Sequence, residues 1–115
     1  MTGVQTCALP IFNHFLSKNY GDENVGVQQL AQGVYLSVSQ TNRRIKEKTG
    51  LTTEQYIRQY RLEQAYEMVM NSRKSVTEIA MDVGFKDMAH FSTCFKRQFG
   101  VSPSEIRRNG GQIAG

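Results

Sequence analysis

The sequence predicts an all-α fold of about seven helices, and three observations lead to this prediction. Apolar residues recur at spacings of three and four along most of the chain, which is the period of a helix buried on one side. Serine or threonine followed three residues later by glutamate or glutamine marks several helix starts. One pattern of apolar residues, a turn and further apolar residues occurs twice, which indicates a duplicated unit.

The second copy of this pattern begins with a short helix and a tight turn. Ser75 and Glu78 form a capping box, in which each side chain binds the backbone N–H of the other residue. Gly84 lies where the turn between two crossed helices needs a positive φ, which glycine adopts without strain. Phe85 follows as the apolar residue that closes the turn. We therefore predict a helix-turn-helix unit that begins near residue 75 and, with its third helix, extends to about residue 108.

The helix after this turn has two different faces. Asp87 can cap it and Gly100 can end it, so we expect a helix over residues 87–99. At about 100° per residue, one stripe holds the apolar side chains Phe91, Cys94, Phe95 and Phe99. The other side is small, polar and basic, with Ala89, Ser92, Thr93, Lys96 and Arg97. That face suits a helix that enters a DNA major groove, and a solvated face of an ordinary helical bundle is the alternative.

A third helix follows directly. Ser102 and Glu105 form another capping box, and Pro103 occupies the first helical position, where its missing N–H costs nothing.

The first copy lies at about residues 27–50. Its apolar residues before the turn match those of the second copy at an offset of 49: Val27 with Val76, Leu30 with Ile79, Ala31 with Ala80, Val34 with Val83, and Leu36 with Phe85. After the turn the offset is 50, as in Ile45 with Phe95, Gly50 with Gly100, and Thr52 with Ser102. The second turn should therefore be one residue longer.

The helix predicted over residues 38–49 carries the stronger set of hydrogen-bond donors. Ser37 and Gln40 form its capping box. Its inner side is expected to hold Thr41, Ile45 and Lys48, and its outer side Ser39, Asn42, Arg43 and Lys46. Arginine can bind guanine O6 and N7 through two bonds, and asparagine can bind adenine N6 and N7 in the same way. This helix is our candidate for direct base recognition, and a solvated basic face is the alternative.

The remaining segments connect and flank these units. A helix over about residues 11–20 is indicated by Ile11, Phe12, Phe15, Leu16 and Tyr20. A long helix, capped near Thr52 and continuing to about Met70, would span roughly 27 Å. That length can hold two recognition helices about one turn of DNA, roughly 34 Å, apart. Residues 1–11 lack any helical period and resemble an in-frame translation of a sequencing adapter, so we expect a non-native or disordered tail there. Residues 109–115 are expected to form a flexible tail.

Composition narrows the classes of function. The net charge of +4 and the sequence pI of about 9.3 give a modest basic excess that suits a polyanionic partner. No apolar run approaches the roughly 18 residues of a membrane span. Cys7 and Cys94 provide no disulfide framework, and His14 and His90 are isolated, so no metal and no cofactor is expected. No nucleophile–base pair or phosphate-binding loop is evident, which argues against an enzyme.

One family resemblance is specific. The second copy contains I-A-x-x-V-G-F and then F-S-x-x-F-K-R-x-F-G-V-S-P-S-E-x-R, at residues 79–85 and 91–107. This pattern resembles the C-terminal signature of the AraC/XylS family of bacterial transcription regulators. The resemblance covers about residues 12–108 and implies two homeodomain-like helix-turn-helix units joined by a linker helix, here residues 52–70. Two positions depart from the family pattern: Thr41 replaces a leucine-like residue, and Tyr35 occupies the place of the turn glycine.

The resemblance also implies a function and site residues. Sequence-specific binding of double-stranded DNA is expected through recognition helices 38–49 and 87–99. The implied base-reading residues are Ser39, Asn42 and Arg43 in the first unit and Met88, Ala89, Ser92 and Thr93 in the second. The implied phosphate-contacting residues are Lys46, Lys86, Lys96 and Arg97. The second base-reading set has few paired donors, so we expect mainly methyl and van der Waals contacts there.

Further expectations concern the whole protein. The resemblance implies a cytoplasmic regulator with a sensor or dimerisation domain upstream, and it allows for a contact with RNA polymerase. Residues 49–65 particularly resemble members fused to hybrid two-component sensors, so an output domain of such a sensor is one alternative. A helical protein-interaction module without a role on DNA is another. Fusion to a DNA-repair alkyltransferase is a third, but Cys94 lies on the apolar stripe, where its reactivity should be low.

Overall fold

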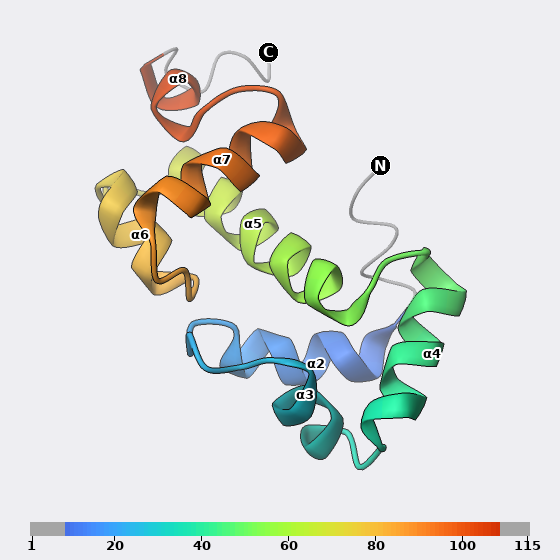
Figure 1. The fold of residues 1–115 in the computed structure, drawn as a ribbon. Helices are drawn as coiled ribbons and strands as arrows, with labels where there is room; N and C mark the ends of the chain where they lie inside the picture. The colour runs from blue at the N-terminus through green and yellow to red at the C-terminus, as the bar shows by residue number, and fades with distance from the viewer. Residues whose placement is uncertain (1–8, 109–115) are drawn as a thin grey trace. The chain divides into compact units, whose positions relative to one another are not determined.

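The computed structural model describes residues 9–108, and the regular structure in this range is entirely helical, as predicted (Figure 1). The helices are α2 (Pro10–Asn19), α3 (Val27–Gly33), α4 (Val38–Thr49), α5 (Thr53–Asn71), α6 (Val76–Asp82), α7 (Met88–Phe99) and α8 (Pro103–Arg108). Two compact units divide the chain, Met1–Tyr60 and Arg61–Gly115, and the boundary falls within α5. Within the described range, no helix combines the length and apolarity needed to cross a membrane.

The first unit packs α2, α3, α4 and the N-terminal part of α5 around one core. Phe12 and Leu16 from α2, Ile45 from α4 and Tyr56 from α5 are almost fully buried in it. The rings of Phe12 and Tyr56 meet edge to face, with their centroids 6.5 Å apart. The hydroxyl of Tyr56 donates to the side-chain oxygen of Asn13, so α2 is attached to α5 by polar as well as apolar contacts.

Packing of this unit begins earlier in the chain than the sequence pattern predicts. Leu9 is only 6% exposed and belongs to the core, and Pro10 is the first residue of α2. A tail boundary after residue 11 is therefore wrong for these two residues. The helical-face prediction is also wrong for Ile11, which is 47% exposed. Residues 1–8 and 109–115, which were expected to be tails, lie outside the described residues.

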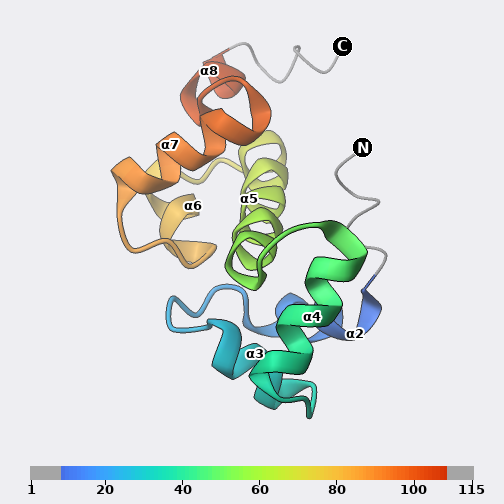
Figure 2. The same ribbon diagram turned by 45° about the vertical axis from the view of Figure 1, so that its right-hand side comes forward.

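The two helix-turn-helix units have the same local geometry, which confirms the internal repeat (Figure 2). The helices before the turn, α3 and α6, have 7 residues each, and those after it, α4 and α7, have 12 each. In each turn an apolar residue donates its backbone N–H to the carbonyl of the repeated alanine: Leu36 to Ala31 at 3.0 Å, and Phe85 to Ala80 at 2.9 Å. The turns cover residues 34–37 and 83–87, so the second is longer by one residue, as predicted.

The predicted caps are present at the helix ends. The capping boxes that form are Ser37 with Gln40, Thr52 with Gln55, Ser75 with Glu78, and Ser102 with Glu105. The Asp87 carboxylate accepts from the backbone N–H of Ala89 at 2.9 Å and so begins α7. Gly50 and Gly100 end α4 and α7 with φ of 75° and 84°. These local bonds define where the helices start and stop.

Tyr35 adopts the left-handed backbone conformation that Gly84 has in the second turn. Gly84 in the second turn has a φ of 93°, and Tyr35 at the matching position of the first turn has a φ of 62°. A residue with a Cβ pays about 1–2 kcal/mol for this conformation. The Tyr35 side chain is 94% exposed, so no packing within the unit compensates for the strain.

Thr41 is the other departure from the family pattern. It is 0% exposed, and its hydroxyl oxygen has no hydrogen-bond partner among residues 9–108. Phe91, at the matching position of the second unit, is also 0% exposed but is wholly apolar. The first unit therefore buries a polar group where the second buries an aromatic ring. Lys48, predicted on the inner side of α4 with Thr41, is exposed, and that part of the prediction is wrong.

An aromatic cluster forms the core of the second unit. Phe91 and Phe95 are 0% exposed, and their ring centroids are 5.7 Å apart. Phe99 is half-buried, and its ring centroid lies 4.6 Å from that of Phe95 and 4.8 Å from that of Tyr66 in α5. The predicted apolar stripe thus holds α7 against the C-terminal part of α5.

Arg107 joins α8 to the segment that follows α5. Its guanidinium donates to the backbone carbonyls of Val69 at 3.2 Å, Ser72 at 3.0 Å and Lys74. These carbonyls lie in the last turn of α5 and just beyond it, where helix geometry leaves them without partners. Arg107 therefore has a structural role in this unit.

Candidate nucleic-acid interface

The outer face of α4 brings the predicted side chains of the first unit together. Ser39, Asn42, Arg43 and Lys46 are exposed and recur at the three- and four-residue spacing of one helix side. All four line a single groove, together with Val27 and residues 52–54 at the start of α5. The opposite side of α4 is anchored in the core through Thr41 and Ile45. The core thus fixes which way the donors face.

Two of these four side chains already make hydrogen bonds inside the protein. The Asn42 side-chain oxygen accepts a hydrogen bond of 2.5 Å from the hydroxyl of Thr53, the first residue of α5. Thr53 is only 3% exposed. The Lys46 ammonium donates to the Gly50 carbonyl at 3.1 Å, which uses one of its three protons and caps the end of α4.

The outer face of α7 carries the predicted residues of the second unit. Ala89, Thr93, Lys96 and Arg97 are exposed, and so is Lys86 in the preceding turn. Met88 and Ser92 are half-buried. Bidentate donors near the start of α7 are scarce, so this face offers small side chains and methyl groups there and positive charge near its end.

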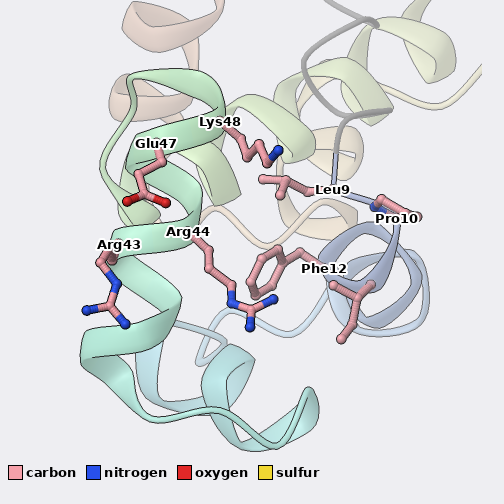
Figure 3. Close-up of a pocket in the computed structure, with 8 residues that line it drawn as sticks. Leu9, Pro10, Phe12, Arg43, Arg44, Glu47 and Lys48 are labelled. Carbon is pink, nitrogen blue, oxygen red and sulfur yellow. The ribbon is translucent and has the colours of Figure 1, made fainter.

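A second groove of the first unit includes residues that sequence reasoning did not select (Figure 3). Its walls are the start of α2, from Leu9 to Phe12, and the charged side chains Arg43, Arg44, Glu47 and Lys48 of α4. Figure 3 shows Arg44 lying toward the ring of Phe12, whereas the guanidinium of Arg43 points away from that ring. The cue for Arg44 and Lys48 was their place in a basic helix, but only the packing of α2 shows which side they take.

Two observations on residues 9–108 concern metal-binding groups and the thiol of Cys94. No cluster of three or more histidine, cysteine, aspartate or glutamate residues suited to a metal ion occurs there. Cys94 is a free thiol but only 5% exposed, and it lies on the stripe that packs α7.

Comparison with known proteins identifies the class. The model of the helix-turn-helix domain family matches residues 30–109. The HTH-type transcriptional activator RhaS of Escherichia fergusonii is 40% identical over 98 residues, which are 84% of this chain and 35% of that protein. RhaS of Mannheimia succiniciproducens is 36% identical over 81% of this chain and 34% of its own length. The chain therefore spans about a third of the length of the curated relatives it matches.

Solved structures agree. The DNA-binding domain of the global transcriptional factor AdpA, in complex with a target DNA, superposes with a TM-score of 0.78 at 28% identity, covering 88% of this chain and 90% of that chain. The C-terminal domain of AraT, a response regulator from Geobacillus stearothermophilus, gives 0.76 at 28% identity, covering 87% and 85%. The helix order and the matching family model together define a double helix-turn-helix domain. The chain belongs to the AraC/XylS family, which confirms the resemblance found in its sequence.

Proposed function

We propose that this domain binds double-stranded DNA sequence-specifically, by inserting α4 and α7 into the major groove, as the output part of a longer bacterial regulator. The observation that carries the proposal is the exposed row of Ser39, Asn42, Arg43 and Lys46 on α4, fixed by a buried inner face and lining one groove. The DNA complex of AdpA, which shares the fold at 28% identity, supports the same use of this domain.

The two helices take different roles in this proposal. Ser39, Asn42 and Arg43 read base edges from α4, and Lys46 anchors a phosphate. Met88, Ala89, Ser92 and Thr93 contact bases from α7 through small and apolar groups. Lys86, Lys96 and Arg97 neutralise phosphates, and these contacts set the register without reading sequence.

Two roles for the longer regulator have support. The RhaS relatives are named transcriptional activators, which favours a regulator that activates transcription and contacts RNA polymerase. AraT and YesN of Fusobacterium nucleatum are response regulators whose C-terminal domains match at 28% and 26% identity, which favours a two-component input as the second candidate. In either case we propose a protein that acts by binding alone, without catalysis, in the cytoplasm where bacterial DNA lies.

The test compares three single variants on a selected DNA site and on a scrambled one across a salt series. Arg43→Ala should cost about 1–3 kcal/mol on the selected site and relax preference at one base pair. Lys96→Ala should weaken binding to both DNAs equally and reduce the salt slope by about one. Arg44→Ala is the matched control, because it removes the same charge from the neighbouring position of α4 and should not change the preference at any base pair.

Equal loss on both DNAs for Arg43→Ala would show that α4 is only an anchor. Failure of the unmodified chain to distinguish the selected from the scrambled DNA would refute sequence-specific binding altogether.

A further inference from the structure

We infer that Thr53 is a positioning residue for base recognition: it fixes the Asn42 carboxamide so that Asn42 offers only hydrogen-bond donors to the DNA. Asn42 then selects bases with a carbonyl oxygen in the major groove, guanine or thymine, over the amino bases adenine and cytosine. The inference rests on the proposed function and adds the chemical preference of one side chain and the residue that sets it.

The hydrogen bond between Thr53 and Asn42 carries the argument. The Thr53 hydroxyl donates to the Asn42 side-chain oxygen over 2.5 Å and links the second turn of α4 to the first residue of α5. Thr53 is 3% exposed, so its hydroxyl has little access to water. A buried hydroxyl needs a partner, and Asn42 supplies it. The bond is therefore present before any DNA arrives.

The orientation of the carboxamide follows from this bond. The oxygen and nitrogen of an asparagine side chain diverge from one carbon, so an oxygen held toward Thr53 leaves the NH₂ group facing the other way. Asn42 is exposed and Thr53 is buried, so the NH₂ group lies on the solvent side of their hydrogen bond, at the outer face of α4. Two N–H donors are presented there, while the oxygen, which has a second lone pair, is turned toward α5 and away from the outer face.

The consequence is a change in which base fits. An asparagine with both groups free makes two bonds to adenine, accepting from N6 and donating to N7. With the oxygen engaged, the N6 amino group of adenine meets a donor instead of an acceptor, and so does the N4 amino group of cytosine. Guanine O6 and N7, and thymine O4, are acceptors that match the exposed NH₂ group, whereas adenine offers it only N7, beside the mismatched N6 amino group. The adenine contact expected from sequence is thereby disfavoured.

The experiment uses the 115-residue chain and the site selected with it. The base pair read by Asn42 is first located as the one whose preference disappears in Asn42→Ala. All four bases are then placed at that position. Affinity is measured for the unmodified chain, for Thr53→Val, Thr53→Ser and Asn42→Asp, and for Asn42→Ala with and without Thr53→Val. Thermal unfolding of each variant is recorded as the structural control.

The unmodified chain should bind guanine or thymine about tenfold more tightly than adenine and cytosine, a ratio that corresponds to about 1.4 kcal/mol. Thr53→Val removes the hydroxyl at nearly constant volume and should reduce the ratio below about threefold, whereas Thr53→Ser should keep it. In the Asn42→Ala background, Thr53→Val should change nothing further. Asn42→Asp can still accept from Thr53 but presents an acceptor outward, so the preference should reverse toward cytosine or adenine.

Three results would overturn the inference: preference of the unmodified chain for an amino base, an unchanged ratio in Thr53→Val, or an effect of Thr53→Val that persists without Asn42. The reversal expected of Asn42→Asp does not depend on Thr53→Val folding, so its absence also counts against the inference. A different result is equal binding of the unmodified chain to the selected and the scrambled DNA. That result would refute the proposed function on which the inference rests.

Discussion

Replacing Thr41 by valine should stabilise the first unit. Thr41 is 0% exposed, and no residue in the described part of the chain bonds its hydroxyl, so folding removes that group from water without compensation. An unsatisfied buried hydroxyl costs about 1–3 kcal/mol. Valine has nearly the same shape and is also β-branched, so it fills the same space without new strain. We expect Thr41→Val to raise the free energy of unfolding by about 1–2 kcal/mol.

Urea unfolding followed by circular dichroism measures this change, because a higher midpoint at unchanged slope reports stability alone. Two controls isolate the hydroxyl. Thr41→Ser keeps it and removes only the methyl group, so stability should fall by about 1 kcal/mol. Thr93→Val makes the same exchange at an exposed position of α7 and should change stability by less than about 0.5 kcal/mol. A loss of stability in Thr41→Val would show that the hydroxyl has a partner and that the reasoning is wrong.

Three further predictions concern stability. Phe95→Ala should cost about 3–5 kcal/mol, because Phe95 is 0% exposed at the centre of the aromatic cluster, and a loss below about 1 kcal/mol in urea unfolding would contradict that. Leu9→Ala should cost about 2 kcal/mol in the same assay, whereas no change would restore the tail boundary after residue 11. Hydrogen bonds from the backbone and the side chain of Ser102 lower the pKa of Glu105 below its ordinary 4.5. The ionised Glu105 carboxylate therefore stabilises the folded state above pH 4.5, and this contribution is lost as the pH falls through the lowered pKa. Glu105→Gln keeps the bond to Ser102 but cannot ionise, so it should remove the part of the loss of stability in acid that Glu105 causes. Thermal unfolding from about pH 3 to about pH 6 measures this change.

Sequence determined the features that depend on a few consecutive residues. The capping boxes at Ser37 and Ser75 form because serine and the residue three places on are neighbours in any helix start. The repeat at offsets of 49 and 50 fixed both helix-turn-helix units and the longer second turn. The repeat also aligned Tyr35 with Gly84, and the structure gives both a positive φ, because the same turn geometry imposes a similar dihedral on either residue.

The helix faces were predictable for the same reason, except at their edges. A helical period places Ile45 inside and Arg43 outside, and the structure agrees. Period alone cannot show how far a neighbouring helix covers the border of a face. Ile11 and Lys48 were both assigned to inner faces, and both are exposed.

Only the tertiary structure decided which distant groups meet. Leu9 enters the core because α2 packs against the rest of the first unit, which no local pattern indicates. The oxygen of Asn42 is engaged because Thr53, 11 residues later, brings a buried hydroxyl to it. The hydroxyl of Thr41 is buried without a partner within the described residues, which its sequence position does not reveal. Backbone preferences and caps are written in neighbouring residues, but the partner of a buried polar atom is supplied by a different segment of the chain, and its position exists only after the helices have packed.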